Sequence, residues 1–367
     1  MKPALWATLG LALAAAWLTL TVHCNDGGNW TALYYNGAQS TVPPQLGDED
    51  VFQFPGTSGY DGMFYHYVAH DPLMRRGFAR YVDNVRLRWR RILVPGLASL
   101  LALGSDDYVD SVYVGVTLGF LWLGCFWLSR YCEQNGLYSA LGMAFIVLPP
   151  AMVSLDRMTV DISLAALCIG AAVVEGPWLY VVLTAAPLAR ETGLILVAAY
   201  LISSRRWRAS FCLVPWLAWS AFVQVSTGAD QTRWLGFPFS GITDRTLHPV
   251  QFALTTRWLE IASALDYLAL LGIWLAFLIA ISFAVRRRFG FLELACVLFT
   301  MFASILGKPD IWSDAYAFGR TLAPILIWMA LIGVSSRTWW YLAPVLMVMP
   351  RIFFQYAPQW KGVLHCA

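Results

Sequence analysis

The chain has few charged side chains. Asp, Glu, Lys and Arg make up 13% of its 367 residues, whereas a soluble domain usually carries about a quarter. Hydrophobic residues make up 59%. They gather into runs of about 20, the length needed to cross the hydrocarbon core of a bilayer. This pattern excludes a soluble or nucleic-acid-binding protein. It predicts an all-α polytopic integral membrane protein, with residues 1–367 forming one transmembrane domain.

Lysine is nearly absent. Lys2, Lys308 and Lys361 are the only lysines, and every other Lys or Arg position is an arginine. Arginine can bind phosphate and carboxylate groups through two parallel hydrogen bonds, so the bias suits a protein that handles phosphate. The general arginine bias of a GC-rich genome explains it equally well.

The cysteines show no spacing typical of a metal site. Cys125, Cys168, Cys212 and Cys296 fall inside apolar runs, where cysteine serves as a small core residue. Cys24 and Cys366 are both expected on the outer side of the membrane, so a disulfide between them is possible.

The apolar runs predict about ten transmembrane helices. The first run, 4–22, follows Lys2 and is interpreted as a signal anchor, with a cleaved signal peptide as the alternative. Two of the later runs are only about a dozen residues long, so they are expected to be half-helices or a re-entrant pair. The later runs are 112–129, 137–154, 162–176, 178–189, 192–203, 209–226, 264–285, 290–306, 320–335 and 338–354.

Arginine-rich segments predict the orientation of these helices. The positive-inside rule places "SRRWR" (204–208), "RRRF" (286–289), Arg130 and Arg337 on the cytoplasmic side. Alternation then places the remaining connections outside. These are 23–111, 155–161, 189–191, 227–263, 307–319 and the tail after 355.

The first outer loop, 23–111, is too long to be a simple connector. Within it, "LRWRRILVPGLASLLALG" (87–104) has a basic beginning followed by an apolar run too short to cross the bilayer. It predicts an amphipathic helix on the membrane surface with its arginines facing lipid headgroups. A short additional span is the alternative.

Ionisable side chains concentrate in the expected outer loops, several of them at helix starts or breaks. Such groups are costly at membrane depth and mark functional positions. A transporter would place them near the midplane on broken helices of paired repeats. An enzyme acting on a lipid-linked substrate would collect them at one face, and this second pattern matches the sequence better.

The richest stretch is "GYDGMFYHYVAHDP" (59–72). Glycines on both sides of the Tyr60-Asp61 pair allow a sharp turn that exposes the Asp61 carboxylate. A carboxylate partly withdrawn from water beside an aromatic ring can act as a general base. An ordinary turn aspartate is the alternative.

His66 and His70 are four residues apart and would share one face of a helix. With Asp61 or Asp71 nearby they can bind a divalent metal, or they can bind loop carbonyls or a substrate instead. The pair alone does not define a metal site, so we expect no metal or other cofactor, with a divalent ion as the alternative.

Three further motifs bring arginines to the outer face. "DRMTVD" (156–161) contains Asp156 and Arg157, and Arg157 can alternatively form an intrahelical ion pair with Asp161. "LARETG" (188–193) places Arg190 and Glu191 in a break between two short runs.

"AYAFGRTLAP" (315–324) places Arg320 at the outer start of a later span. Arg157, Arg190 and Arg320 are therefore expected to clamp a phosphate. The neighbouring aromatics, Trp312, Tyr316 and Phe318, line a sugar site or anchor the chain in the interfacial belt.

This layout resembles the GT-C superfamily of membrane glycosyltransferases. The resemblance rests on an amino-terminal span, the exposed Asp in 59–72, the amphipathic "RWRRILVP" and many spans. "LARETGLIL" is similar to an Arg-x-x-Gly-Leu element of mannosyltransferase-like families, and "YAFGRTLAP" to a late arginine motif of bacterial ones.

The resemblance implies an inverting transferase of the bacterial inner membrane with its active site facing the periplasm. It would move a sugar from a polyprenyl-phosphate donor to an envelope glycan or lipid acceptor, with Asp61 as the base. The resemblance carries over a role for Asp61 alone. From the motifs above, the residues expected to bind the donor or another substrate are Tyr60, His66, His70, Asp156, Arg157, Arg190, Glu191 and Arg320. The chain departs from the family pattern because no second acid stands directly beside Asp61 and no large carboxy-terminal domain follows. The alternative is a transporter or flippase for a lipid-linked or acidic solute.

Overall fold

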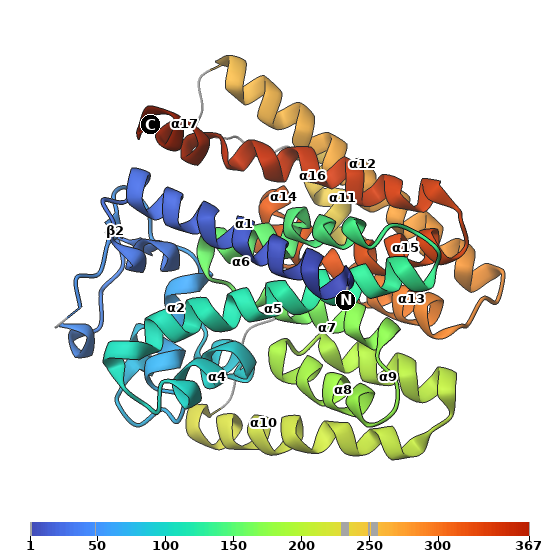
Figure 1. Cartoon of the computed structure of the whole chain (residues 1–367), viewed down its shortest axis with the longest axis horizontal. Helices are drawn as coiled ribbons and strands as arrows, with labels where there is room; N and C mark the ends of the chain where they lie inside the picture. The colour runs from blue at the N-terminus through green and yellow to red at the C-terminus, as the bar shows by residue number, and fades with distance from the viewer. Residues whose placement is uncertain (1, 48, 229–234, 249, 251–255, 367) are drawn as a thin grey trace.

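The computed structural model describes residues 2–47, 49–228, 235–248, 250 and 256–366, and this part of the chain is almost entirely helical (Figure 1). Its α-helices are α1 (Lys2–Asn25), α2 (Asp61–His70), α3 (Val85–Arg90), α4 (Leu93–Leu101), α5 (Asp106–Gln134), α6 (Pro149–Arg157), α7 (Asp161–Val173), α8 (Pro177–Ala189), α9 (Gly193–Ser204), α10 (Val214–Thr227), α11 (Ser240–Leu247), α12 (Thr256–Val285), α13 (Phe291–Ser304), α14 (Ala315–Thr321), α15 (Ala323–Ser335), α16 (Ala343–Gln355) and α17 (Ala357–Cys366).

Short elements connect these helices. Two strands, β1 (Asn36–Gly37) and β2 (Gln53–Phe54), pair in parallel within the first outer loop. The 3-10 helices are η1 (Trp30–Tyr34), η2 (Pro44–Leu46), η3 (Phe78–Tyr81), η4 (Ser139–Val147), η5 (Trp207–Leu213), η6 (Pro309–Trp312) and η7 (Trp339–Leu342).

Several helices are long and apolar enough to cross a membrane. Four pass by length and composition, namely Lys2–Asn25, Asp106–Gln134, Trp207–Thr227 and Arg257–Val285. The count rises to six if η4 with α6, bent by 53°, and α14 with α15, bent by 61°, are each one span. The expectation of about ten spans is therefore not confirmed for the described residues. The difference includes α7, α8, α9 and α13, which are apolar but shorter than 18 residues.

Helices α8 and α9, of 13 and 12 residues, confirm that the last two runs of 162–203 are short. Helix α7, expected over 162–176, is also only 13 residues long. The three helices pack against one another in chain order. A Cβ atom on Gly193 would lie 2.2 Å from the Ala186 carbonyl oxygen, so only glycine lets α9 begin this close to α8. The turn between these two helices carries Arg190 and Glu191.

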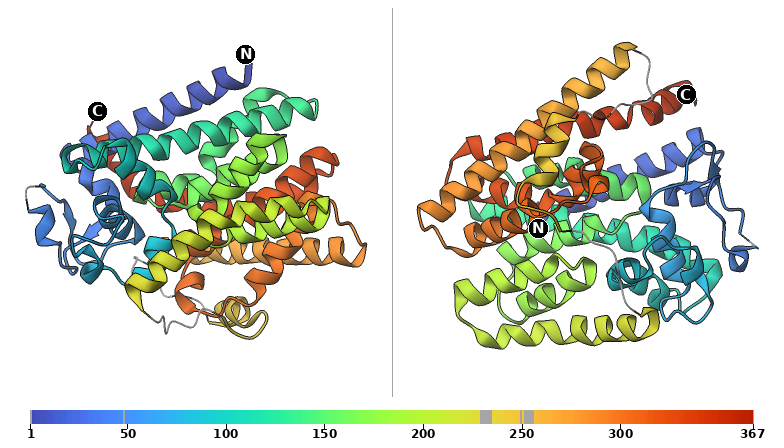
Figure 2. Two further views of the ribbon diagram at one scale, coloured as in Figure 1. Left: turned by 90° about the horizontal axis from the view of Figure 1, so that it is seen from below. Right: turned by 180° about the vertical axis from the view of Figure 1, so that it is seen from behind.

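The first outer loop folds onto the rest of the bundle. Figures 1 and 2 show the segments between α1 and α5 gathered at one end of the long helices. A second hydrophobic cluster joins this loop to α10, where the indole Nε1 of Trp219 donates a hydrogen bond to the Trp89 carbonyl at 2.7 Å. The buried members of that cluster are Leu46, Met63, Tyr67, Val68, Phe78, Trp89 and Val223.

The prediction for 87–104 was wrong in two respects. The segment forms two helices, α3 and α4, instead of one. Arg88 and Arg91 are buried, with 5% and 9% of their surface exposed, and they pair with carboxylates instead of facing lipid headgroups. Amphipathic periodicity failed here because it does not show which carboxylates neutralise these arginines. They are Asp83 and Asp61 for Arg88, and the distant Glu191 for Arg91.

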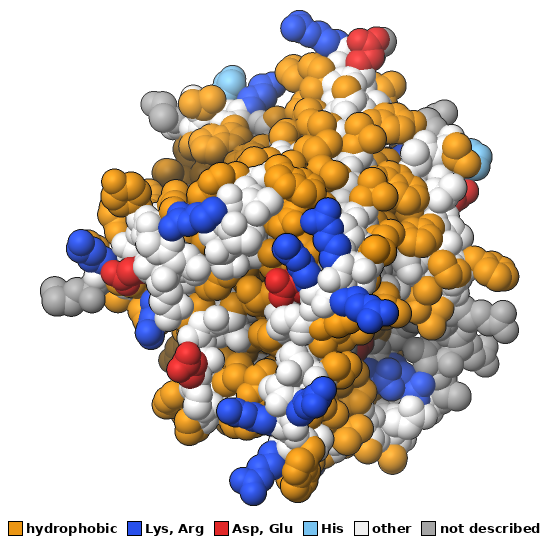
Figure 3. Space-filling view, turned by 90° about the vertical axis from the view of Figure 1, so that its right-hand side faces the viewer, with side chains coloured by type: hydrophobic (Ala, Val, Ile, Leu, Met, Phe, Trp, Pro, Cys, Tyr) orange, Lys and Arg blue, Asp and Glu red, His pale blue; other side chains and the backbone are white. Residues whose placement is uncertain are grey.

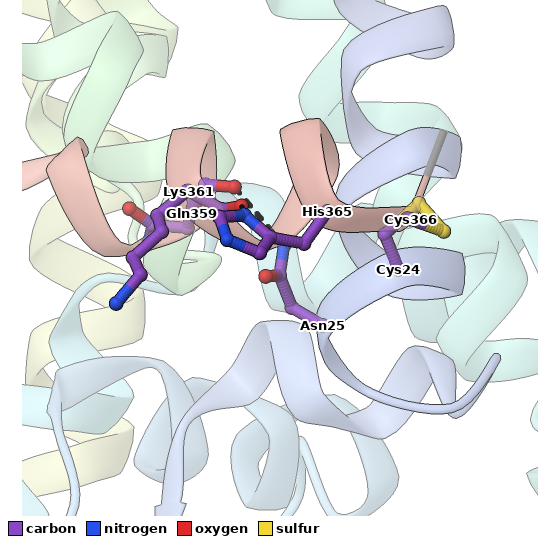
Figure 4. Close-up of a disulfide and its surroundings, with 6 residues drawn as sticks. All are labelled: Cys24, Asn25, Gln359, Lys361, His365 and Cys366. Carbon is purple, nitrogen blue, oxygen red and sulfur yellow. Dashed lines mark hydrogen bonds between the residues drawn. A yellow bond between two sulfur atoms is a disulfide. The ribbon is translucent and has the colours of Figure 1, made fainter.

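A disulfide joins Cys24, near the end of α1, to Cys366 at the end of α17 (Figure 4). The adjacent Asn25 donates a side-chain hydrogen bond to the Gln359 carbonyl at 3.5 Å. The possible disulfide is therefore present, and the start of the first outer loop lies beside the carboxy-terminal tail, as alternation predicted.

Other contacts join segments that alternation placed on one side. Arg337 donates a hydrogen bond to the Asn135 carbonyl, and Leu235 forms a bridge with Leu306. The expected outer segment 227–263 lies partly outside the described residues. Figure 3 shows the end of the molecule opposite the first outer loop, where many Lys and Arg side chains and few acidic ones lie among apolar groups. The arginines that follow α12, Arg286–Arg288, are exposed.

Candidate functional site

Arginines and carboxylates alternate in a set of ion pairs that joins the first outer loop to three distant segments. We call this set the charged cluster. One series of pairs runs Asp83, Arg88, Asp61, Arg320, Asp161 and Arg190, and a separate pair joins Arg91 to Glu191. The two are linked by Tyr65, whose hydroxyl accepts hydrogen bonds from Arg91 at 2.9 Å and from Arg88 at 3.4 Å.

Asp61 lies in the middle of the longer series. Its Oδ1 accepts a hydrogen bond from Arg88 Nη2 at 2.8 Å, and its Oδ2 accepts one from Arg320 Nη2 at 2.6 Å. Burial alone would raise the pKa of the Asp61 carboxyl, but the charges of Arg320 and Arg88 outweigh it and hold this pKa well below its ordinary value. The carboxylate is therefore ionised at neutral pH.

The local backbone explains why Asp61 is held there. Gly59 has a φ of +93°, which L side chains rarely adopt. A Cβ atom on Gly62 would lie 1.9 Å from the Arg157 carbonyl oxygen, so α2 packs directly on the end of α6. Asp61 is the first residue of α2, where the helix dipole stabilises a negative charge. The glycines of "GYDG" therefore fix a helix start as well as a turn.

Arg190 and Glu191 are adjacent in the chain but do not pair with each other. Arg190 pairs with Asp161, the first residue of α7. Glu191 accepts two hydrogen bonds from Arg91, at 2.9 and 3.0 Å. The two residues thus tie the break between α8 and α9 to α7 and to the first outer loop.

The charged cluster opens into a cavity of about 570 Å³, which we call the basic cavity. Six cationic and four acidic side chains line it, so its net charge is positive. Apolar side chains complete the wall. The cations are Arg88, Arg90, Arg91, Arg190, Lys308 and Arg320, and the apolar residues include Leu87, Leu194, Ile195, Phe302, Leu306 and Ile311.

Three of these arginines retain unused hydrogen-bond donors. The Nε atoms of Arg90, Arg190 and Arg320 are buried, and they have no acceptor among the described residues. A buried donor without a partner is rare in folded proteins. An anionic ligand in the basic cavity would offer acceptors for these donors.

A second cavity of about 660 Å³ lies within the first outer loop, and we call it the loop cavity. Its walls carry hydroxyl and aromatic groups from Ser40, Thr41, Tyr60 and Tyr81. Two carboxylates, Asp61 and Asp83, line both cavities. Of the two, Asp83 is the more exposed, with 47% of its side chain accessible against 20% for Asp61.

Tyr60 lies beside the charged cluster. Its ring is 4.8 Å from the Arg320 guanidinium carbon, and its buried hydroxyl has no partner among the described residues. The ring of this residue also faces Arg157, at 5.6 Å. The Tyr60 ring thus lies between the charged cluster and Arg157, which was predicted to belong to the phosphate clamp.

Asp156 and Arg157 form a separate group. Arg157 donates to Asp156 at 2.7 Å and lies 3.3 Å from the centre of the Tyr35 ring. Asp156 also accepts hydrogen bonds from Tyr316 and Gln359. The intrahelical Arg157–Asp161 pair is absent because Arg157 ends α6 and Asp161 begins α7. Arg157 is not among the residues that line the basic cavity, so Arg190 and Arg320 are the two predicted clamp members that do.

His66 and His70 lie in another group, away from Asp61 and Asp71. Their Nε2 atoms are 3.0 Å apart, and both face Glu49 and Asp110. Asp71 instead accepts hydrogen bonds from the backbone N–H groups of residues 75 and 76, at 2.7 and 2.9 Å.

Four cluster members were not among the predicted site residues, namely Asp83, Arg88, Arg91 and Asp161. The sequence contained a signal for them, because charges beside apolar runs are costly without partners. It did not indicate which acids meet which arginines, since the pairs span up to 259 positions.

Comparisons of the chain with protein-family models, with curated proteins and with solved structures gave no match.

Proposed function

We propose that the chain is a membrane glycosyltransferase of the GT-C type, which transfers a sugar from a polyprenyl-phosphate donor to an envelope glycan or lipid acceptor. The observation that carries the proposal is the position of Asp61, a carboxylate in the walls of both the basic cavity and the loop cavity. A general base must reach the acceptor hydroxyl at the point where it meets the anomeric carbon of the donor sugar. A carboxylate that lines both the donor site and the acceptor site can do so.

The basic cavity suits the donor. Its arginines can hold a phosphate through paired hydrogen bonds, and its leucines and isoleucines can contact the first units of a lipid chain. Arg190 and Arg320 are the proposed clamp, and their unpartnered Nε atoms are available to phosphate oxygens. The loop cavity, with its hydroxyl and aromatic groups, suits a hydroxylated acceptor.

The reaction transfers one glycosyl group. Asp61 removes the proton from the acceptor hydroxyl as its oxygen attacks the anomeric carbon. A new carbon–oxygen bond forms, and the bond from that carbon to the donor phosphate oxygen breaks. The departing phosphate retains the electron pair and is stabilised by Arg190 and Arg320. Attack from the face opposite the leaving group inverts the anomeric configuration.

Donor binding would also make Asp61 a stronger base. In the present arrangement Asp61 shares Arg320 with Asp161, and the pKa of Asp61 is held well below its ordinary value. A donor phosphate that draws Arg320 away removes one of the two cations that lower this pKa. The base would then gain proton affinity only when the donor is in place.

We place the active face outside the cytoplasm, in the periplasm of a bacterial inner-membrane protein. The Cys24–Cys366 disulfide supports this, because disulfides persist in oxidising compartments. The arginine-rich end opposite the first outer loop supports a cytoplasmic location for that end.

The direct test is an assay with purified full-length protein in lipid nanodiscs. Polyprenyl-phosphate sugars with a radiolabelled glycan are supplied with a mixture of envelope glycolipids, and the release of polyprenyl phosphate is measured. A transferase releases labelled product and free polyprenyl phosphate in equal amounts. If the same protein in vesicles instead moves the intact donor across the bilayer without cleaving it, the proposal fails and the flippase alternative holds.

A further inference from the structure

A second group of ligating side chains lies in the first outer loop, outside the charged cluster. His66 and His70 on α2, Glu49 in the segment before β2, and Asp110 in the first turns of α5 point at one another. One ligand atom from each lies within 4.8 Å of every other. His66 is fully buried, and His70 is 5% exposed.

The distances fit the edges of a coordination tetrahedron. Zn²⁺ binds imidazole nitrogen and carboxylate oxygen at about 2.0–2.2 Å, so neighbouring ligand atoms in a tetrahedral site lie about 3.3 Å apart. The two histidine Nε2 atoms are 3.0 Å apart. His66 Nε2 lies 2.8 Å from Asp110 Oδ1 and 3.5 Å from Glu49 Oε2, and His70 Nε2 lies 3.3 Å from Glu49 Oε1 and 3.6 Å from Asp110 Oδ1.

The group brings two carboxylates against two buried imidazoles. Asp110 Oδ1 lies 2.8 Å from His66 Nε2, whereas the buried Glu49 Oε2 lies 3.5 Å from the same nitrogen and has no well-aligned hydrogen-bond donor among the described residues. A carboxylate oxygen buried in this way is rare and calls for a cation. The four side chains together offer two nitrogens and two oxygens, the ligand types that Zn²⁺ accepts.

The surrounding residues orient the histidines for a metal. His70 Nδ1 lies 2.8 Å from Asp106 Oδ1, and this carboxylate favours the tautomer in which Nδ1 carries the proton and Nε2 presents its lone pair to the group. Asp106 is in turn held by two hydrogen bonds from Arg76, at 2.6 and 2.7 Å. A carboxylate behind a ligating histidine is a regular feature of zinc sites. The Tyr34 ring stacks on His66 at 4.1 Å and fixes its plane.

We infer that Glu49, His66, His70 and Asp110 bind one divalent zinc ion, which ties the first outer loop to the long helix α5. Four protein ligands fill a tetrahedral site and leave no position for substrate, so the ion has a structural role. His66 follows Asp61 by five positions on α2, which places it about 140° around the helix and on the other side from the base. The ion therefore fixes α2, and with it the position of Asp61, without contacting the reacting groups.

The test is the metal content of the full-length protein. It is purified in detergent without chelators and without a nickel column, and bound metals are measured by inductively coupled plasma mass spectrometry. We expect about one zinc per chain. His66→Gln and Asp110→Asn should each lose most of it. His248→Gln is the matched control. His248, like His66, pairs with a carboxylate, Asp244, but it is exposed and lies outside the group. The His248→Gln variant should keep the full amount of zinc.

A second measurement does not depend on how the variants fold. Wild-type protein stripped with a chelator is titrated with Co²⁺ alone. Intense visible absorption bands of tetrahedral Co²⁺ with one equivalent bound, and a higher unfolding temperature after Zn²⁺ is restored, support the site. Wild-type protein that is purified free of zinc and binds no Co²⁺ overturns it. Neither result depends on glycosyl transfer, so the metal site and the proposed function can fail separately.

Discussion

Asp61 and Arg320, 259 positions apart in the chain, form an ion pair in which Arg320 Nη2 lies 2.6 Å from Asp61 Oδ2. The pair joins the first outer loop to α14, and it places the proposed base against a member of the proposed phosphate clamp. In the proposed mechanism this arginine has two alternative partners, the carboxylate when the donor is absent and the phosphate when it is bound.

This pair predicts a specific pH dependence. With Arg320 and Arg88 in place, the lowered pKa keeps Asp61 ionised, so kcat/KM should show no acidic limb from this group between pH 5 and 8. In Arg320→Gln one of the two cations is lost while the burial remains, so the pKa of Asp61 rises and the acidic limb moves to higher pH. The profile is measured with labelled donor from pH 4 to 8.

Arg320→Lys is the matched variant for that experiment. It keeps the charge but loses the two-pronged geometry. The acidic limb should therefore stay close to that of the wild type, while donor affinity falls measurably. An acidic limb that is the same in Arg320→Gln and the wild type would show that Arg320 does not control the base.

Variants of Arg190 distinguish a role in phosphate binding from a purely structural role. Arg190→Gln leaves the buried Asp161 with Arg320 as its remaining ion-pair partner, and breaking a buried pair costs about 3–5 kcal/mol of stability. Asp161→Asn in the same chain removes the buried carboxylate that Arg190 had neutralised and should restore most of the unfolding temperature. Donor affinity should stay low in the double variant, because the phosphate ligand is still missing, and it should fall further than in Arg320→Lys. Affinity that recovers together with stability would make the pair a structural element only.

The disulfide gives a prediction on stability and on the side of the membrane. The free energy of unfolding should be about 2–4 kcal/mol lower in the Cys24→Ser/Cys366→Ser double variant than in the wild type. A reductant should destabilise the wild type but not the double variant. In intact cells, a membrane-impermeant maleimide should label the wild type at these positions only after reduction. Labelling of both thiols without reductant would show that the disulfide does not form in the cell.

The sequence predicted the helical class and the positions of most apolar helices. A long apolar run in a bilayer must satisfy its backbone hydrogen bonds internally, and it does so by forming a helix. The short lengths of α8 and α9 were also predicted from run length. The number of spans was not confirmed, because α7, α8, α9 and α13 are shorter than 18 residues. Run length also does not reveal where a helix bends, and both η4 with α6 and α14 with α15 bend by more than 50°.

The site was predicted in part. Asp61, Arg190 and Arg320 do come together in the structure. The sequence did not show that Glu191 pairs with Arg91 or that Arg157 belongs to another group, because the choice of partners depends on tertiary packing. Local spacing suggested Asp61 or Asp71 as neighbours of the two histidines, whereas the structure supplies Glu49 and Asp110.

The most direct test of the account compares two carboxylates that share a partner. Asp61 and Asp83 both pair with Arg88, and both line the two cavities. Asp61→Asn keeps the shape of the side chain and removes the base, so turnover should fall about 100-fold or more while the protein stays folded and still binds donor. Asp83→Asn removes an equal charge from the same arginine and should keep turnover within a few-fold of the wild type. Near-normal turnover in Asp61→Asn, or an equal loss in both variants, would contradict the role of Asp61 as the base.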